Sequence, residues 1–152
     1  MSIATRTGDS GTTGLMYNRR VSKCHPCVAA YGAVDELNAA LGLARATAEH
    51  PFVRDNLLAV QKSLVILMGE LATAVEDLAR YVQEGHGLVT ADMTARLEGL
   101  VAKIEMAKVS PSGWATPGAN TVAAALDLAR KIEAAYGDAS ALAVVASAQV
   151  EA

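Results

Sequence analysis

The sequence predicts an all-α protein, a bundle of five helices in up-and-down order. Three observations support this fold class: alanine occurs 31 times in 152 residues, aromatic residues make up only 4 %, and apolar residues recur at helical spacing along most of the chain. Alanine favours helix over strand, and a core with so few aromatic rings must consist of closely packed aliphatic side chains, as in helix bundles. A hydrophobic content of 52 % excludes intrinsic disorder.

Composition narrows the class of protein further. Two cysteines exclude a disulfide scaffold, and 13 basic against 16 acidic residues, a net charge of −3, argue against bulk nucleic-acid binding. No apolar run approaches the roughly 20 residues needed to span a bilayer, and the N-terminus lacks the apolar core of a signal peptide. We therefore expect a cytoplasmic protein that contacts neither nucleic acid nor membrane and forms a single domain over residues 1–152.

The first segment of the chain, residues 1–27, shows no helical period and is rich in Gly, Thr, Ser and basic residues. We expect an irregular arm there, followed by a helical bundle over residues 28–150. The first helix should cover about Val28–Ala48, and Pro51 suits the first turn of the next. The apolar face of the first helix consists of Val34, Leu37, Leu41 and Ala44.

The second helix has the clearest periodicity, a near-heptad series that continues to Val82 before Gly85 and Gly87 end it. Thr90 is the expected N-cap of a third helix. The second series is Leu57, Val60, Leu64, Leu67, Leu71, Val75, Leu78 and Val82, and the third is Met93, Leu97, Leu100 and Ile104.

An irregular loop over residues 110–118 precedes a fourth helix from about Ala119 to Tyr136. Gly137 and Asp138 are expected to break this helix, so that residues 139–150 form a short last helix. Apolar residues cover two sides of the fourth helix: Val122, Leu126 and Ala129 on one, and Ala125, Leu128 and Ile132 on the other. A helix that is apolar nearly all round is central or lies at a subunit interface, so we expect a homo-oligomer.

Three groups of residues have the chemistry of a binding site. The first is the arm Thr5-Arg6-Thr7-Gly8-Asp9-Ser10-Gly11-Thr12-Thr13-Gly14, followed by Arg19-Arg20-Val21-Ser22-Lys23. Glycines permit close backbone approach to a phosphate, and hydroxyl, amide and cationic groups can bind it. The arm lacks the Gly-Lys-Ser/Thr ending of a Walker A loop, and composition alone also fits a solvated terminal arm.

The second group is Tyr31-Gly32-Ala33-Val34-Asp35-Glu36-Leu37-Asn38, where polar side chains lie within one turn of the first helix. The third is the loop with Trp114, the one tryptophan of the chain, which leads into the helix carrying Arg130. Each group has an ordinary structural explanation as well, namely a solvated helix face and a loop anchored by an aromatic side chain.

Together the three groups resemble a known family, the PduO-type ATP:cob(I)alamin adenosyltransferases. The resemblance rests on Thr5-Arg6-Thr7-Gly8-Asp9-x-Gly11-x-Thr13, Arg20-Val21-Ser22-Lys23, Tyr31-Gly32-x-Val34-Asp35-Glu36-Leu37-Asn38, and Pro117-Gly118 before Leu128-Ala129-Arg130. It implies an enzyme that moves the 5′-deoxyadenosyl group of ATP to the cobalt of a reduced corrinoid and releases triphosphate. It also implies a ferritin-like five-helix bundle assembled as a homotrimer, with small-molecule sites between subunits.

The resemblance assigns roles to individual residues. ATP and Mg²⁺ would lie under the N-terminal loop, residues 1–27, with Arg130 and Asp35 as the catalytic pair across the subunit interface. Trp114 stands where the family usually has the phenylalanine that displaces the lower axial ligand of cobalamin. The remaining nucleotide- and cofactor-binding residues would be Thr5, Thr7, Gly8, Asp9, Gly11, Thr13, Arg20, Lys23 and Asn38.

Two departures from the family pattern keep a second hypothesis open. Ala134 stands where the family has a second arginine, and no counterpart of the family's C-terminal asparagine motif is seen. The sequence Cys24-His25-Pro26-Cys27 is unusual for the family; it could bind a soft metal, exchange thiol and disulfide, or be two reduced thiols beside a turn. The alternative is a non-catalytic or repurposed family member that binds a corrinoid, another tetrapyrrole, or a metal at Cys24, His25 and Cys27.

Overall fold

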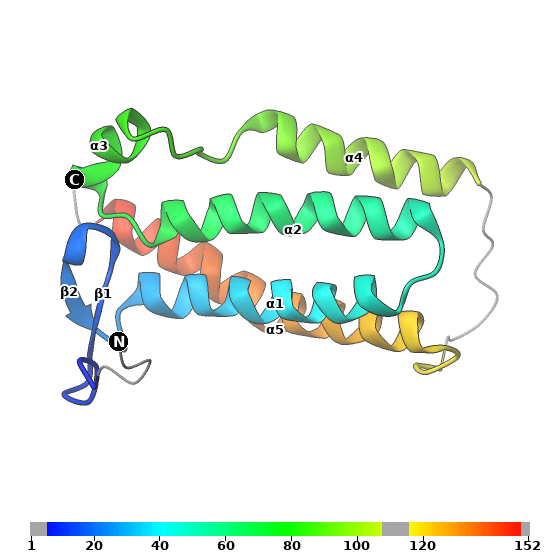
Figure 1. The fold of residues 1–152 in the computed structure, drawn as a ribbon, viewed down its shortest axis with the longest axis horizontal. Helices are drawn as coiled ribbons and strands as arrows, with labels where there is room; N and C mark the ends of the chain where they lie inside the picture. Colours follow the sequence, from blue (N-terminus) through cyan, green and yellow to red (C-terminus); the bar gives the residue numbers. More distant parts are fainter. Residues whose placement is uncertain (1–5, 108–115, 150–152) are drawn as a thin grey trace.

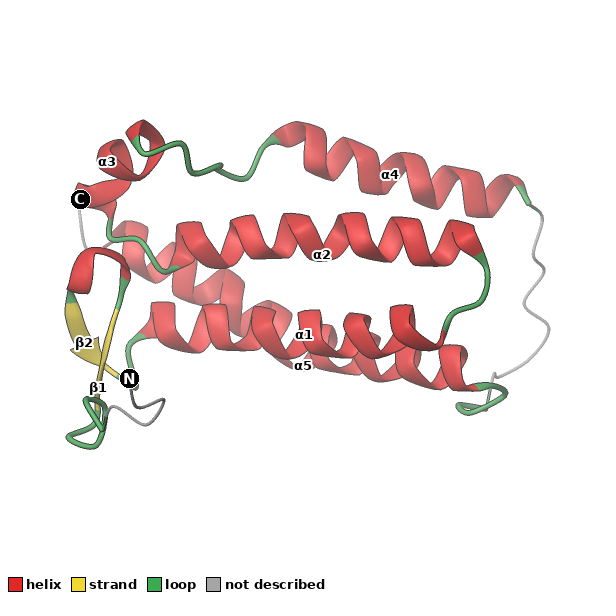
Figure 2. Cartoon of the chain, in the orientation of Figure 1, coloured by secondary structure: helices red, strands yellow, loops and turns green. Residues whose placement is uncertain are grey.

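The computed structural model describes residues 6–107 and 116–149, with side chains in the last helix as far as residue 135. This part of the chain is mostly helical, as predicted, and also contains a small two-stranded sheet (Figure 2). The α-helices are α1 (Pro26–Thr47), α2 (Pro51–Leu71), α3 (Leu78–Gln83), α4 (Ala91–Met106) and α5 (Thr121–Gln149). Short 3₁₀ turns lie at Met16–Asn18 (η1) and Val75–Asp77 (η2).

The N-terminal arm is more regular than predicted, because it forms an antiparallel hairpin. Strand β1 (Thr12–Gly14) pairs with β2 (Arg20–Ser22) in the register Thr12 opposite Ser22 and Gly14 opposite Arg20. Three-residue strands give no readable alternation of apolar and polar residues, so the sequence pattern could not reveal them. Figure 1 shows the hairpin at the end of the bundle where α1 begins and α3 lies.

The centre of the fold is α1, which packs against both α2 and α5 (Figure 1). Its predicted apolar face is confirmed, since Val34 and Ala44 are buried and Leu37 and Leu41 half-buried. The seam with α5 consists mainly of small side chains, among them Ala40, Ala44, Ala125 and Ala129. Small residues at a helix contact let the two backbones approach closely.

The predicted second helix is too long. Its apolar series is half-buried from Leu57 to Leu71, where α2 ends, and beyond that point only Leu78 is half-buried. The chain then turns through 106° between α2 and Val75–Gln83, so Val75 and Val82 are exposed. At this turn the Thr73 hydroxyl donates to the Gly69 carbonyl at 2.7 Å, and Met16 N donates to the Ala72 carbonyl at 2.8 Å.

The last helix also differs from the prediction, because α5 continues through Gly137 and Asp138 to Gln149 and no separate fifth segment exists. Only one side of its first part is buried. Val122 and Ile132 are half-buried beside the buried Ala125 and Ala129, whereas Leu126 and Leu128 are exposed. Asn120 caps the helix by accepting a hydrogen bond from Ala123 N at 2.8 Å.

Helix α4 lies beyond α2 in Figure 1 and is the least buried of the long helices. Only Met93 and Leu100 are half-buried; Leu97, Val101 and Ile104 are 46 %, 54 % and 54 % exposed. In the described ranges no single helix is long and apolar enough to cross a membrane, although α2 with Val75–Gln83 passes the same criterion as a bent pair.

Candidate functional site

The hairpin brings Gly8, Gly11 and Lys23 together at its open end. Lys23 N donates to the Gly11 carbonyl at 2.9 Å. A Cβ atom on Gly8 would lie 3.1 Å from Lys23 Nζ and 3.4 Å from the Thr12 carbonyl oxygen, so glycine is what lets the amine lie against the backbone. Gly11 has φ +78°, a left-handed conformation that favours glycine. The two predicted glycines are therefore explained by the geometry of this end.

Lys23 forms no ion pair with a carboxylate among the described residues. The ion pairs seen in residues 6–107 and 116–135 involve Arg19, Arg80, His86 and Arg130, but not Lys23. Asp9 and Thr7 lie on the same loop and are exposed, and Thr13 is half-buried in β1. An exposed ammonium above a glycine-rich loop is suited to bind a phosphate group.

Arg20 closes the loop from the side. Its Nη2 donates to the Thr7 carbonyl at 2.6 Å and to the Thr12 carbonyl at 3.2 Å, and it also contacts the Thr12 hydroxyl. These contacts join the segment before β1 to β2. Arg20 was predicted to bind the nucleotide. In the structure its guanidinium is hydrogen-bonded to the loop and stabilises the loop's conformation.

The turn end of the hairpin is fixed to the bundle by a polar cluster that sequence reasoning missed. We call it the clasp: Tyr17 and Arg19 from the hairpin, with Asp77, Arg80 and Glu84 from η2 and α3. Arg19 donates through Nε and Nη2 to the two Asp77 oxygens. Tyr17 Oη donates to Glu84 at 2.9 Å, Arg80 Nε donates to Glu84 at 2.8 Å, and the Arg80 guanidinium lies 4.1 Å from the centre of the Tyr17 ring.

The clasp changes the acidity of its members. The hydrogen bond from Arg19 lowers the pKa of Asp77, and those from Arg80 and Tyr17 lower the pKa of Glu84. Burial and the hydrogen bond to Glu84 raise the pKa of the Tyr17 phenol. Both carboxyl groups are therefore ionised at neutral pH. Nothing in the spacing of Asp77 and Glu84 marks them in the sequence, because their partners on the hairpin, Arg19 and Tyr17, are 58 and 67 residues away.

Asp35 and Arg130, the predicted catalytic pair, are not in contact within one chain. Asp35 is exposed on α1. The Arg130 side chain is 62 % exposed and donates to Asp127 Oδ1 through Nε at 3.0 Å and Nη2 at 2.6 Å. Asn38 is half-buried. Its backbone carbonyl accepts a hydrogen bond from Gln61 Nε2 at 3.1 Å, whereas its side-chain oxygen Oδ1 is buried and has no hydrogen-bond partner among the described residues.

The segment Cys24-His25-Pro26-Cys27, for which metal binding was one hypothesis, leads into α1. His25 is the N-cap of α1, and its Nδ1 accepts a hydrogen bond from Cys27 N at 3.2 Å. Cys24 is exposed, whereas burial raises the pKa of the Cys27 thiol and disfavours the thiolate that a metal needs. Over the described ranges no three His, Cys, Asp or Glu side chains are placed to hold a metal ion, so the structure gives this hypothesis no support.

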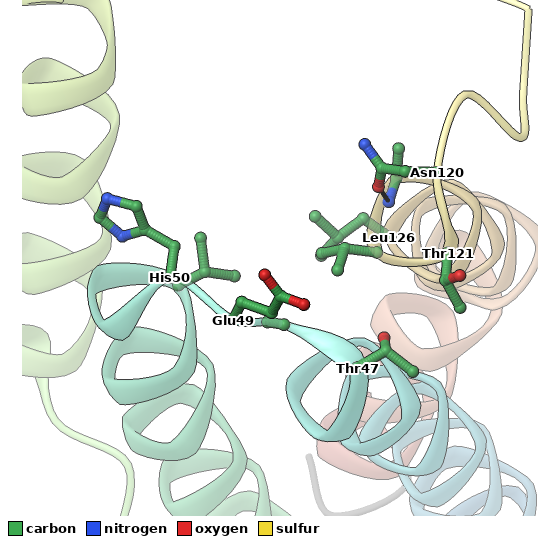
Figure 3. Close-up of a pocket in the computed structure, with 10 residues that line it drawn as sticks. Thr47, Glu49, His50, Asn120, Thr121 and Leu126 are labelled. Atoms are coloured by element: carbon green, nitrogen blue, oxygen red, sulfur yellow. Dashed lines mark hydrogen bonds between the residues drawn. The ribbon is translucent and has the colours of Figure 1, made fainter.

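A cavity of about 530 Å³ lies at the opposite end of the bundle from the hairpin. Figure 3 shows its two walls, the turn between α1 and α2 with Thr47, Glu49 and His50, and the start of α5 with Asn120 and Thr121. None of the predicted site residues lines it. Two further predicted site residues, Thr5 and Trp114, lie outside the described residues.

Comparison with known proteins identifies the family. Residues 3–133 match the cobalamin adenosyltransferase family. The chain belongs to this family. A corrinoid adenosyltransferase of Citrobacter freundii is 39 % identical over 131 residues, which are 86 % of this chain and 72 % of that protein. The corrinoid adenosyltransferase PduO of the same organism is 40 % identical over 136 residues, covering 87 % of this chain but 38 % of the relative, so the chain spans well under half of that protein's length.

Solved structures agree with this assignment. A variant of the PduO-type ATP:corrinoid adenosyltransferase from Lactobacillus reuteri, complexed with cobalamin and ATP, superposes with a TM-score of 0.74 at 27 % identity. The match covers 91 % of this chain and 75 % of that one. A second variant of the same enzyme, complexed with ATP, gives a TM-score of 0.75 at 26 % identity, over 90 % of this chain and 75 % of that one.

Proposed function

We propose that this chain transfers the 5′-deoxyadenosyl group of ATP to the cobalt of a reduced corrinoid and releases triphosphate. The observation that carries the proposal is the open end of the hairpin, where the Lys23 ammonium lies over Gly8 and has no carboxylate partner among the residues that the structure describes. Membership of the cobalamin adenosyltransferase family supplies the reaction, and the complexes of the relatives supply the two substrates.

The reaction requires the protein mainly to bind the two substrates and to stabilise negative charge on the leaving group. The reduced cobalt is itself a strong nucleophile toward the 5′ carbon, so no general base is required. The triphosphate leaves with several negative charges, and cations held near it stabilise the transition state. Lys23 would supply one such cation at the open end of the hairpin. Asp9 is the carboxylate that would hold Mg²⁺ beside the phosphates.

A homotrimer with sites between subunits is part of the proposal, and the surface of one chain supports it. No large side chain among the described residues is fully buried, whereas Val65 of α2 is 56 % exposed and Leu97, Val101 and Ile104 of α4 are about half exposed. So much apolar surface on one subunit indicates that other subunits cover it. Assembly would also bring Asp35 of one subunit to Arg130 of the next, a pair that one chain does not form.

The remaining assignments stay predictions: one domain over residues 1–152, a cytoplasmic location, and contacts of Thr5, Asn38 and Trp114 with substrate. The departure at Ala134 makes the activity worth testing directly. Losing one charge-assisted contact to a phosphate weakens binding by about 1.5–3 kcal/mol, which a site with other cations can tolerate.

The test is an anaerobic assay with MgATP and chemically reduced cobalamin. We expect adenosylcobalamin and triphosphate in equal amounts. Lys23→Ala should weaken ATP binding by at least tenfold, about 1.5 kcal/mol or more for a charge-assisted contact. Lys103→Ala, near the far end of α4, is the matched control and should bind ATP normally. Absence of both products from the unsubstituted chain would refute the enzymatic function, and equal ATP affinity of Lys23→Ala and the control would refute the assigned loop.

A further inference from the structure

We propose that the clasp sets the position of the nucleotide-binding end of the hairpin, so that Arg19, Asp77, Tyr17 and Glu84 are positioning residues for ATP. They would act through the hairpin and not by touching the nucleotide. The inference rests on the proposed function, in which the end with Gly8 and Lys23 binds the triphosphate.

The two ends of the hairpin have different tasks. The open end carries Gly8, Gly11 and Lys23, whereas the turn end, residues 15–19, carries the contacts with the bundle. Strands of three residues are too short to hold their own place, since an isolated two-stranded hairpin is at best marginally stable in water. The position of the open end therefore depends on how firmly the turn end is attached.

The backbone conformation and the contacts of the turn end show that the bundle supports it. Tyr17 and Asn18 have φ values of +58° and +61°, a left-handed conformation that asparagine tolerates but that is unfavourable for a bulky residue such as Tyr17. Such a conformation persists only where the surroundings fix it. Met16 N donates to the Ala72 carbonyl at 2.8 Å, which joins the backbone of the turn to the end of α2. The Tyr17 hydroxyl donates to Glu84, and the Arg80 guanidinium lies over the face of the Tyr17 ring.

Strand β2 connects the clasp to the phosphate end. Arg19 and Arg20 are neighbours with separate tasks: Arg19 binds Asp77 on the bundle, while Arg20 donates to the Thr7 and Thr12 carbonyls of the loop. Lys23 follows the end of β2 directly, and its N–H is bonded to the Gly11 carbonyl. A tilt of the strand at Arg19 therefore moves the Lys23 ammonium and the loop together.

The test compares three variants of the full chain by calorimetric titration with MgATP. Asp77→Asn keeps the shape of the side chain but removes the charge that binds Arg19, and we expect ATP affinity to fall about three- to fivefold. Glu98→Gln removes the same charge from an exposed position on α4, where no contact with the hairpin is seen among the described residues, and should leave affinity unchanged. Exchanging the pair, Arg19→Asp with Asp77→Arg, should restore most of the affinity. In the assay, Asp77→Asn should raise KM for ATP and leave kcat unchanged.

A second measurement keeps the result interpretable if a variant is less stable. Amide hydrogen exchange over residues 6–24 should be faster in Asp77→Asn, while exchange in α1 and α5 stays as in the unsubstituted chain. If Lys23→Ala loses ATP affinity but Asp77→Asn keeps it, the positioning role is overturned and the proposed function stands. If Lys23→Ala also binds ATP like the unsubstituted chain, the hairpin is not the nucleotide site, and both proposals fail.

Discussion

The seam between α1 and α5 and the N-terminal hairpin are held in opposite ways. The seam consists of alanines with at most 6 % of their surface exposed, and it contains none of the hydrogen bonds between side chains seen in the described residues. The hairpin buries one large apolar residue, Leu15. It depends on the clasp and on the hydrogen bonds that Arg20 donates to the loop. The seam is therefore sensitive to side-chain volume, and the hairpin is sensitive to charge and pH.

This contrast follows from what each region does. A seam of alanines allows close approach along the whole helix and leaves no room for adjustment. A loop that binds and releases a charged substrate, as we propose for this one, needs exposed donors and cations, so apolar burial cannot hold it. Polar contacts at its turn end fix the loop while its open end stays accessible to solvent.

Enlarging a side chain in the seam should have the largest effect. Ala44 is 0 % exposed on α1, and Ala44→Leu would force α1 and α5 apart. We expect the free energy of unfolding to fall by about 1–3 kcal/mol, measured by urea denaturation. Ala46→Leu, two residues along the same helix at an exposed position, is the control and should change stability little. Equal effects of the two substitutions would contradict the picture of a tight seam.

A substitution at the contact between α2 and α3 should have a smaller effect on stability. A Cβ atom on Gly69 of α2 would lie 2.2 Å from the Oη atom of Tyr81, which is buried in α3. We therefore expect Gly69→Ala to destabilise the protein by about 1 kcal/mol, although alanine alone favours helix. Gly99→Ala in α4, where a Cβ atom meets nothing within 4 Å, should instead stabilise slightly.

A double substitution separates the clash from other causes. Tyr81→Phe removes the Oη atom, so the pair Gly69→Ala with Tyr81→Phe should be more stable than the sum of the single changes predicts. Strict additivity in thermal denaturation would show that Tyr81 is not the obstacle.

Much of the helical part could be predicted from the sequence. The face of α1, the start of α2 at Pro51 and the position of Thr90 before α4 were all readable, because periodicity and helix-start signals are local. The break after Leu71 was not readable. The heptad series continues through it, and the contacts that favour the turn come from Met16 and Tyr81, which are distant in sequence or lie beyond the break.

The residues of the candidate site likewise include some that the sequence could reveal and others that it could not. Gly8, Gly11 and Lys23 could be selected because their chemistry lies in one short segment. The clasp could not be found, since it pairs Arg19 with Asp77 across 58 residues and depends on a fold that the spacing does not reveal. Asp35 and Arg130 came from the family resemblance, and a single chain leaves them apart.

The smallest expected effect is the pH dependence of the clasp. The hydrogen bond from Arg19 lowers the pKa of Asp77 from its ordinary 3.8, with Arg80 contributing in the same direction. A lowered carboxyl pKa contributes stability that is fully present above the ordinary value and is lost as pH falls through the lowered one. The Glu84 carboxyl, held by Arg80 and Tyr17 and near His86, follows the same rule from its ordinary 4.5. On the acid side, the hairpin should therefore loosen below about pH 4.

Asp77→Asn isolates this contribution, because asparagine has the shape of the protonated carboxyl group and does not titrate. At pH 7 the unsubstituted chain should melt about one or two degrees higher than Asp77→Asn, as expected for an exposed ion pair. The difference should shrink as the pH falls below 4 and disappear once Asp77 is protonated. Glu98→Gln, at an exposed position on α4, should show no such difference at either pH. If the difference in melting temperature between the unsubstituted chain and Asp77→Asn persists at low pH, Asp77 stabilises the hairpin by its shape and not by its charge. The contrast between a seam that depends on side-chain volume and a hairpin that depends on charge would then be wrong for the hairpin.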